Sequence, residues 1–125
     1  MRRVIIESPY AGDIEANIAY LRRCLHDCLM RNEAPLASHG LYTLPGVLDD
    51  NILDQRARGL DAGWAWYRVA NACVVYIDRG ISSGMELGIK HAATMGIPIE
   101  YRKFGILQRA YACGGSVSGR RIYPA

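Results

Sequence analysis

The sequence predicts an α/β fold of flavodoxin-like type, in which four parallel strands in the order 2-1-3-4 form the middle of three layers. Two observations carry this prediction. Short apolar runs typical of buried strands alternate with longer segments of helical periodicity, which gives the order β-α-β-α-β-α-β. Each pair of successive strands is also far enough apart in the chain for a right-handed helical crossover.

The size and composition fit one domain of this kind. The chain has 125 residues, of which 50% are hydrophobic and 22% charged, a balance that excludes collagen-like, coiled-coil and wholly disordered chains. No apolar run approaches the roughly 18 residues of a transmembrane helix, and the apolar run after Arg3 is too short for a signal peptide. We therefore expect a soluble, cytoplasmic protein.

The N-terminal half contains the first two predicted strands, at residues 4–6 and 35–38. Between them, Asp13 is a typical N-cap for a helix over about residues 14–31. Hydrophobic residues recur along this helix with a spacing that places them on one face. The predicted buried face consists of Ile14, Ile18, Leu21, Leu25 and Leu29.

The C-terminal half repeats the alternation. A helix is expected from Asp50 to about residue 70, and residues 73–77 form the clearest strand of the chain. A further helix extends over about residues 83–95, where Gly96 ends it, and the last strand is expected at residues 97–101. These elements complete a domain over residues 1–102.

Residues 103–125 are expected to form a basic C-terminal tail, either flexible or docked on a neighbouring subunit. Residues 102–125 contain five basic residues and no acidic one, so the formal charge of +3 leaves residues 1–101 at 3 − 5 = −2. The tail lacks the dense Lys/Arg clusters of a nucleic-acid-binding arm, so we do not expect nucleic acid as a partner.

The four cysteines do not form a recognisable metal motif. Cys24 and Cys28 are four residues apart on a predicted helix, with His26 on a different face, and no CxxC pair is present. Thiols of a protein in a reducing compartment explain them, and we expect no metal and no cofactor.

The ligand site is expected at the carboxyl ends of the strands, near the point where the strand order reverses. Residues 8–13 and 78–86 form the two loops there. Their small residues let a ligand approach the backbone, and the helix that follows offers free N–H groups. Ser82, Ser83 and Gly84 are the candidate contacts to a sugar or a phosphate.

Glu86 has two interpretations. Ser83 and Glu86 have the spacing of a capping box, in which each side chain accepts a hydrogen bond from the other residue's backbone at a helix start. A carboxylate in a first helical turn beside a ligand crevice is also a ready nucleophile or general base. From the residues alone, both interpretations stay open.

The segment Gly84-Met85-Glu86-Leu87-Gly88, followed by Ala92 and Gly96-Ile97-Pro98, resembles the signature of nucleoside 2-deoxyribosyltransferases and the related deoxynucleoside 5′-monophosphate N-glycosidases. The opening Ser-Pro-Tyr-Ala-Gly-Asp at residues 8–13 is also similar to that of short phage and bacterial proteins of the same superfamily, whose activity is unsettled. The resemblance spans residues 3–101, and only the segment around Glu86 is specific. It implies that Glu86 is the nucleophile on the anomeric carbon.

The resemblance also shows where this sequence departs from the superfamily. The aspartate usual before the third strand falls near Ala65, so Asp61 is the candidate substitute; the alternative is an exposed helical carboxylate. The monophosphate hydrolases have a basic residue in the first loop and a serine later, where this chain has Tyr10 and Gly80. A 5′-phosphate pocket therefore loses two of its usual groups, although Ser82, Ser83 and Arg79 remain.

Other candidates each have a structural alternative. Tyr10 is placed to stack on a base or to anchor the first helix, and Gly12 and Asp13 are expected near the ligand, although Asp13 as an N-cap needs no further role. Asp78 ends the strongest strand, where acids often act, but it also suits a turn. For His39 a hydrogen-bonded structural role is favoured. The sequence has no nucleophile elbow, which disfavours a serine hydrolase.

Trp64, Trp66 and Tyr67 are expected to be core and interface aromatics. They give one helix more apolar surface than a four-stranded sheet can cover, which predicts a homodimer or a larger homo-oligomer. The resembling enzymes are oligomers in which a neighbouring chain completes each site. The tail supplies candidate groups for that role: Arg109, Tyr111, Arg120, Arg121 and Tyr123.

The predicted function is cleavage or transfer of the N-glycosidic bond of a nucleoside or nucleotide through a glutamate nucleophile. The alternative is a non-catalytic binding module that captures a nucleotide-derived small molecule, with Glu86 kept as a cap. An oligomeric scaffold without a ligand is a third, weaker possibility. The sequence does not specify the base, the sugar or the acceptor.

Overall fold

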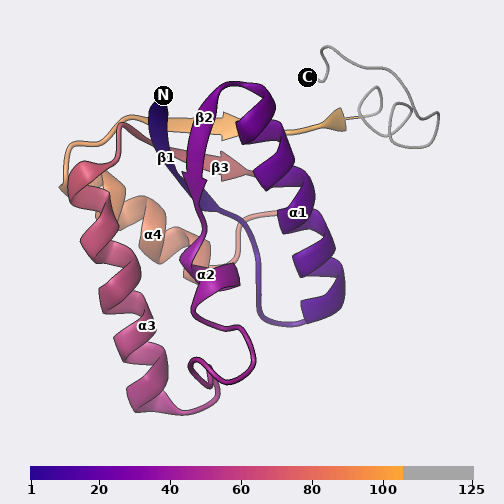
Figure 1. Ribbon diagram of the computed structural model, residues 1–125, viewed down its shortest axis with the longest axis vertical. Helices are drawn as coiled ribbons and strands as arrows, with labels where there is room; N and C mark the ends of the chain where they lie inside the picture. Colours follow the sequence, from indigo (N-terminus) through magenta and orange to yellow (C-terminus); the bar gives the residue numbers. More distant parts are fainter. Residues whose placement is uncertain (106–125) are drawn as a thin grey trace.

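Four short strands form a parallel sheet with helices on both faces, as the computed structural model shows for residues 1–105, the part of the chain that it describes (Figure 1). The predicted tail contacts at residues 106–125 lie outside this part. The elements are, in chain order, β1 (Arg2–Glu7), α1 (Ile14–Met30), β2 (Glu33–Leu36), α2 (Ser38–Leu41), α3 (Leu53–Ala65), the 3-10 helix η1 (Trp66–Val69), β3 (Ala72–Tyr76), α4 (Ser83–Thr94) and β4 (Ile99–Arg102).

The sheet has the order β2-β1-β3-β4 with all strands parallel, which confirms the predicted fold class and strand order. β1 lies between β2 and β3: Ile5 pairs with Leu36 on one side and with Cys73 on the other. The carboxyl ends of the strands therefore meet at one edge of the sheet. The loops after β1 and β3 leave the sheet side by side at this edge.

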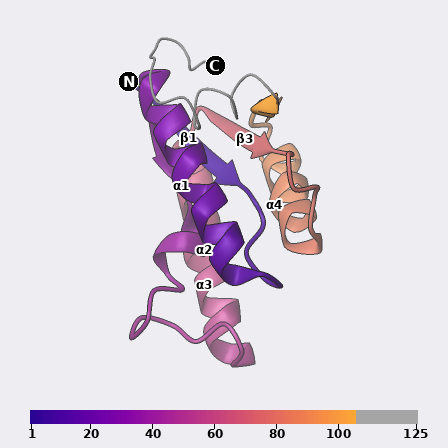
Figure 2. The same cartoon turned by 90° about the vertical axis from the view of Figure 1, so that its right-hand side faces the viewer.

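Alternation along the strands creates two separate cores. Side chains at even positions, such as Val4, Ile6 and Tyr76, pack beneath α1. Those at odd positions, such as Ile5 and Cys73, pack against η1 and α4 on the opposite face. Figure 2 shows α1 and α4 on opposite sides of β1 and β3. Residue 7 shares the parity of Ile5, so its side chain is directed toward the face that α4 covers.

Helix α1 begins as predicted, since the Asp13 side chain accepts a hydrogen bond from the backbone N–H of Ala16 at 3.2 Å. The predicted buried face is wrong at both ends, because Ile14 and Leu29 are 44% and 49% exposed. The helix is rotated so that a partly polar stripe faces the sheet. The buried residues of α1 are Asn17, Tyr20, Leu21, Cys24, Asp27 and Cys28.

Polar partners explain this rotation. The Tyr76 hydroxyl donates to Oδ2 of the buried Asp27 at 2.7 Å, and Arg79 donates to the side chain of Asn17 at 2.8 Å. On the same face the buried Arg102 forms hydrogen bonds of 2.9 and 2.7 Å with both carboxylate oxygens of Glu33. Buried polar groups are tolerated where such partners exist, and hydrophobic periodicity does not register them.

Several element boundaries differ from the prediction. α3 begins at Leu53 rather than Asp50, because the Asp49 side chain accepts a hydrogen bond from the N–H of Asn51 at 3.0 Å and holds a turn there. β2 begins two residues earlier than predicted, and the short helix α2 begins at Ser38, the last residue of the predicted second strand. Among residues 1–105 no helix is long and apolar enough to cross a membrane.

Candidate functional site

A cavity of about 240 Å³ lies at the carboxyl edge of the sheet, where the fold predicts a ligand site. We call it the edge cavity. Its walls come from the end of β1, the segment from α2 to α3, and the first turns of α4. Its lining residues are Glu7, Ser8, Tyr10, Ala11, Ser38, His39, Tyr42, Thr43, Leu48, Asp50, Gln55, Arg56, Gly59, Leu60, Trp64, Tyr67, Ser82, Ser83, Gly84, Met85 and Gly88.

Glu7 provides a partly buried carboxyl group in this cavity. As the last residue of β1 it points to the face covered by η1 and α4, where the hydroxyl of Tyr67 donates to its Oε2 at 2.6 Å. Burial raises the pKa of Glu7 to about 7, and the bond from Tyr67 acts in the opposite direction by favouring the carboxylate. Near pH 7 the group therefore exchanges readily between its acid and carboxylate forms.

Gly88 makes room for this carboxyl group. A Cβ atom at position 88 would lie 2.1 Å from Oε2 of Glu7 and 2.4 Å from its Cδ, closer than real Cβ contacts occur. Gly88 is buried in the second turn of α4, where glycine costs about 1 kcal/mol of helix stability relative to alanine. The close approach of β1 and α4 at this point thus requires glycine.

Ser8 and His39 form a second polar pair beside Glu7. Ser8 Oγ and His39 Nε2 are 2.7 Å apart, and both residues line the edge cavity. Burial lowers the pKa of His39 to about 4, so the imidazole is neutral at pH 7. His39 is hydrogen-bonded, as predicted, and it also lines the edge cavity, where the pair offers a hydroxyl and a ring nitrogen to a ligand.

An aromatic cluster fixes Tyr67. Its ring and the ring of His91 in α4 meet edge to face at 4.9 Å between centroids, and Trp64 stacks on the His91 ring at 4.6 Å. Tyr67 is buried, as predicted for a core aromatic, while Trp66 is 47% exposed and donates its indole N–H to the Tyr42 hydroxyl. The cluster joins η1 to α4 and holds the Tyr67 hydroxyl on Glu7.

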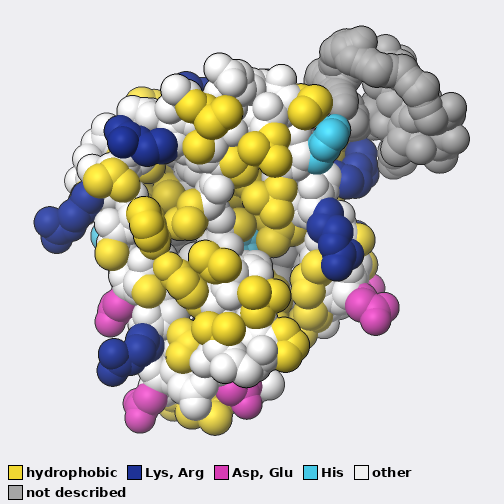
Figure 3. Space-filling model, viewed as in Figure 1, with side chains coloured by type: hydrophobic (Ala, Val, Ile, Leu, Met, Phe, Trp, Pro, Cys, Tyr) yellow, Lys and Arg dark blue, Asp and Glu magenta, His cyan; other side chains and the backbone are white. Residues whose placement is uncertain are grey.

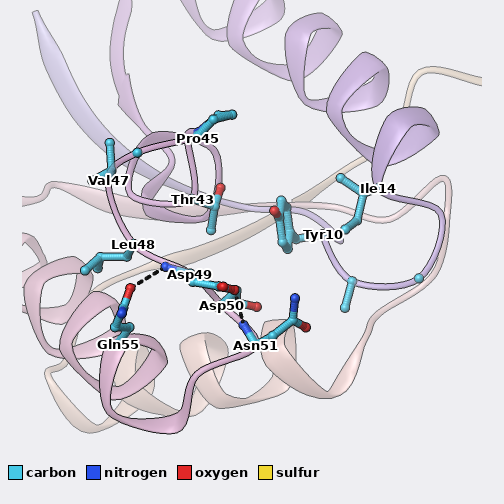
Figure 4. Close-up of a pocket in the computed structure, with 13 residues that line it drawn as sticks. Tyr10, Ile14, Thr43, Pro45, Val47, Leu48, Asp49, Asp50, Asn51 and Gln55 are labelled. Atoms are coloured by element: carbon cyan, nitrogen blue, oxygen red, sulfur yellow. Dashed lines mark hydrogen bonds between the residues drawn. The ribbon is translucent and has the colours of Figure 1, made fainter.

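A second, more open depression of about 570 Å³ adjoins the edge cavity. Tyr10 lines both, and in Figure 4 its ring lies between Thr43 and Ile14. Across the opening, the backbone N–H of Asp49 donates to the Gln55 side chain at 2.6 Å, which fixes the opposite wall. Tyr10 therefore stands at the boundary between the two spaces.

The predicted loop after β3 reaches the cavity only in part. Ser82, Ser83 and Gly84 line the edge cavity, whereas Gly80 does not. The capping box predicted for Ser83 and Glu86 is wrong. The N-cap is Ser82, whose Oγ accepts from the N–H of Met85 at 3.2 Å, while the Met85 sulfur accepts from the N–H of Ser82. The helix begins one residue earlier than the box requires.

The three predicted catalytic acids lie outside the edge cavity. Glu86 is exposed in the first turn of α4, and its side chain has no hydrogen bond or ion pair within residues 1–105. Asp61 lies on the exposed side of α3, beside a separate shallow depression. Asp78 accepts hydrogen bonds from the Tyr20 hydroxyl and from the backbone N–H groups of Phe104 and Gly105, so it ties the ends of β3 and β4 together.

The loop after β1 is likewise divided. Tyr10 lines the edge cavity, and Gly12, which has a φ of 97°, lines only the outer depression. Asp13 serves as the N-cap of α1 and lines neither space. Arg79, a possible phosphate ligand from the sequence, donates to Asn17 at 2.8 Å and is likewise no part of the edge cavity.

The sequence interpretation missed Glu7 and Gly88. Glu7 cannot be recognised as a cavity residue by its position alone, because an acidic residue after three apolar ones is typical of the polar end of a strand. The signal that identifies it is the alternation of side chains along a strand, because residue 7 faces the same side of the sheet as the buried Ile5. Gly88 belongs in sequence to the motif around Glu86, and its contact with Glu7 joins segments that are distant in the chain.

The thiols and other potential ligands form no metal centre in the described part of the chain. Within residues 1–105, no group of three or more His, Cys, Asp or Glu side chains is arranged to hold a metal ion. Cys24, Cys28 and Cys73 are buried and free, and burial raises the pKa of each thiol. They behave as small apolar core residues.

The fold is similar to that of two deoxyribosyltransferases, and it is thus a deoxyribosyltransferase-like α/β fold. The 2-deoxyribosyltransferase of the psychrotolerant bacterium Bacillus psychrosaccharolyticus matches with a TM-score of 0.65 and 12% identity, over 81% of this chain and 72% of that one. The 2-desoxiribosyltransferase of Leishmania mexicana matches with a TM-score of 0.58 and 14% identity, over 94% and 75%. At these identities the likeness concerns the fold.

Residues 2–102 match a family described as a domain of unknown function, DUF7768. The chain belongs to this family. Among curated proteins no sequence matches it.

Proposed function

We propose that this protein cleaves or transfers the N-glycosidic bond of a nucleoside or nucleotide in the edge cavity. The observation that carries the proposal is a partly buried carboxyl group that opens into a cavity at the carboxyl edge of a deoxyribosyltransferase-like sheet. Breaking an N-glycosidic bond passes through an oxocarbenium-like state, which a carboxylate within reach stabilises and traps. The two similar enzymes are named as deoxyribosyltransferases, which supports this reaction class.

The other groups of the cavity suit the parts of such a substrate. Ser8 and His39 offer hydrogen bonds for sugar hydroxyls. Ser82 and Ser83, at the N-terminus of α4, suit a sugar or a phosphate oxygen through their backbone and hydroxyl groups. Tyr10, at the boundary with the outer depression, is placed to stack on a nucleobase.

A non-catalytic binding module is the second candidate, and one observation favours it. Glu86, the residue that the resemblance assigns as the nucleophile, is exposed and does not line the edge cavity. A protein that uses the cavity only to capture a nucleotide-derived molecule would keep the aromatic and hydroxyl groups and need no carboxylate on the anomeric carbon.

One experiment separates these two functions. The full chain is incubated with ribonucleosides, deoxynucleosides, their 5′-monophosphates and NAD-like compounds, in the presence of a chelator, and the free base is followed by chromatography. Binding of each compound is measured in parallel by calorimetry. Release of free base, or its exchange when a second base is added, supports the proposal. Binding without release supports the binding module, and neither binding nor release from any compound contradicts both.

A further inference from the structure

Two glutamates lie near the site, and their carboxylates face different directions. Glu86 and Gly88 are two residues apart in α4, which corresponds to about 200° around a helix. Gly88 faces β1 so closely that a Cβ atom there would meet the Glu7 carboxylate at 2.1 Å. Glu86 therefore points away from β1 and toward solvent, in agreement with its exposure.

We propose that Glu7, at the end of β1, is the nucleophile that attacks the anomeric carbon of the sugar, in place of Glu86. The inference rests on the proposed N-glycosidic activity and names its catalytic carboxylate. It depends on three observations: the access of Glu7 to the edge cavity, the space that Gly88 leaves for its carboxyl group, and the fixed position of the Tyr67 hydroxyl that donates to it.

The first observation concerns the two oxygens of Glu7. Oε2 accepts the hydrogen bond from Tyr67 and lies against Gly88. Oε1 has no hydrogen-bond partner among residues 1–105. It is also not fully buried, because the buried side-chain atoms without a partner in that part of the chain do not include it. Oε2 is thus held in place by Tyr67, whereas Oε1, which a Cβ atom at position 88 would meet at 2.8 Å, has no partner and is not fully buried.

The third observation is the pre-organisation of this carboxylate. Tyr67 is held by His91, which is itself stacked on Trp64, so the hydroxyl that orients Glu7 comes from a packed aromatic cluster. Side chains fixed in this way lose little further freedom in a transition state. Ser8, the next residue along the chain, is paired with His39 beside it, which places polar groups for sugar hydroxyls next to the nucleophile.

The reaction step balances as follows for a nucleoside. An oxygen of the Glu7 carboxylate forms a bond to C1′ while the C1′–N bond breaks, and the electron pair of that bond leaves with the base nitrogen, which takes a proton from water. A water molecule then attacks C1′ and breaks the ester bond, which restores the carboxylate, and its proton passes to solvent. A second nucleobase in place of this water gives transfer.

The test combines variants with covalent trapping. Glu7→Gln keeps an oxygen that accepts from Tyr67 and loses the nucleophile, so it is expected to fold and to lose activity by roughly 1,000-fold or more on the compound that the wild type cleaves. Glu15→Gln is the matched control, because Glu15 is an exposed acid of the first turn of α1 that lines neither cavity. Thermal unfolding of each variant shows whether a loss of activity comes from a loss of folded protein.

Trapping identifies the nucleophile directly. A 2′-fluorinated nucleoside slows hydrolysis of the glycosyl ester, and trypsin then separates the two glutamates into the peptides 4–22 and 80–90. We expect the sugar mass on the first peptide, with fragment ions that assign it to Glu7 rather than Glu15. A label on Glu86, or full activity in folded Glu7→Gln, would overturn the inference while leaving the proposed activity intact. A wild type that cleaves none of the compounds would instead refute the activity, and the inference with it.

Discussion

Replacing Glu7 by glutamine is expected to stabilise the protein at pH 8 and to leave its stability nearly unchanged at pH 4. In the folded protein, burial raises the pKa of the Glu7 carboxyl group from 4.5 to about 7. In the unfolded chain the pKa returns to its ordinary value. Between these two values the folded protein holds a proton that the unfolded chain has released, so the free energy of unfolding falls as the pH rises through this window.

The size of the effect follows from the two pKa values. The difference between 4.5 and about 7 is about 2.5 units, which corresponds to about 3 kcal/mol at roughly 1.4 kcal/mol per unit. Glutamine stays neutral at every pH and still accepts the hydrogen bond from Tyr67. Glu7→Gln is therefore expected to unfold with a free energy up to about 3 kcal/mol larger than the wild type at pH 8, and to differ by less than about 1 kcal/mol at pH 4.

The assay is urea unfolding of both proteins at pH 4, 5, 6, 7 and 8. The difference between the two curves isolates Glu7, because every other titrating group is common to both. Tyr67 and Cys73, whose pKa values burial and the Glu7 charge both raise, stay protonated over this range, and His39 loses its proton at about pH 4 in the folded state. A difference that does not change with pH, or a variant less stable than the wild type at pH 8, would refute the reasoning.

Two further predictions concern the opposite limb of the pH profile and the assembly. Burial lowers the pKa of His39 from 6.5 to about 4, so the unfolded chain binds a proton at a higher pH than the folded protein, and the free energy of unfolding falls as the pH drops through this window. His39→Gln should remove about 3 kcal/mol of this acid destabilisation. Urea unfolding between pH 6.5 and 4 that shows the same pH dependence in variant and wild type would contradict the prediction. The segment from the end of α2 to the start of α3 exposes Leu41, Leu44, Val47, Ile52 and Leu53, and Figure 3 shows apolar side chains gathered on the face seen in Figure 1. Light scattering at micromolar concentration should therefore report a multiple of 13.9 kDa. The mass of one chain would exclude a stable oligomer.

The sheet could be predicted from the sequence because periodicity reports burial directly. Runs such as residues 73–77 have no polar interruption, and their alternation with helices leaves few topologies. The buried face of α1 could not be predicted in the same way. Asn17 and Asp27 are buried there with hydrogen bonds from Arg79 and Tyr76, although Oδ1 of Asp27 has no partner among residues 1–105. Both partners are more than 45 residues away in the chain.

The edge of the sheet that carries the candidate site could also be predicted, but the chemistry of that site only in part. Ser82, Ser83 and Tyr10 line the edge cavity as expected of loops at the carboxyl ends of strands. The acids could not be assigned, because the same sequence spacing suits a cap, a turn or a catalytic group. Asp78 illustrates the difficulty: its place after β3 suits catalysis, whereas its carboxylate is occupied by Tyr20 and by backbone N–H groups.

Glu7 and Gly88 both lower the stability of the folded protein at the positions that they occupy. A buried carboxyl group costs about 3 kcal/mol at neutral to basic pH by the reasoning above, and a glycine inside a helix costs about 1 kcal/mol more. An apolar side chain at position 7 and alanine at position 88 would avoid both costs, as Ile5 and Ala92 do at nearby core positions. The two unfavourable choices meet at one contact, where the glycine leaves space for the carboxylate. Their coincidence favours a chemical role for Glu7 over a structural one, since packing alone would gain from replacing both.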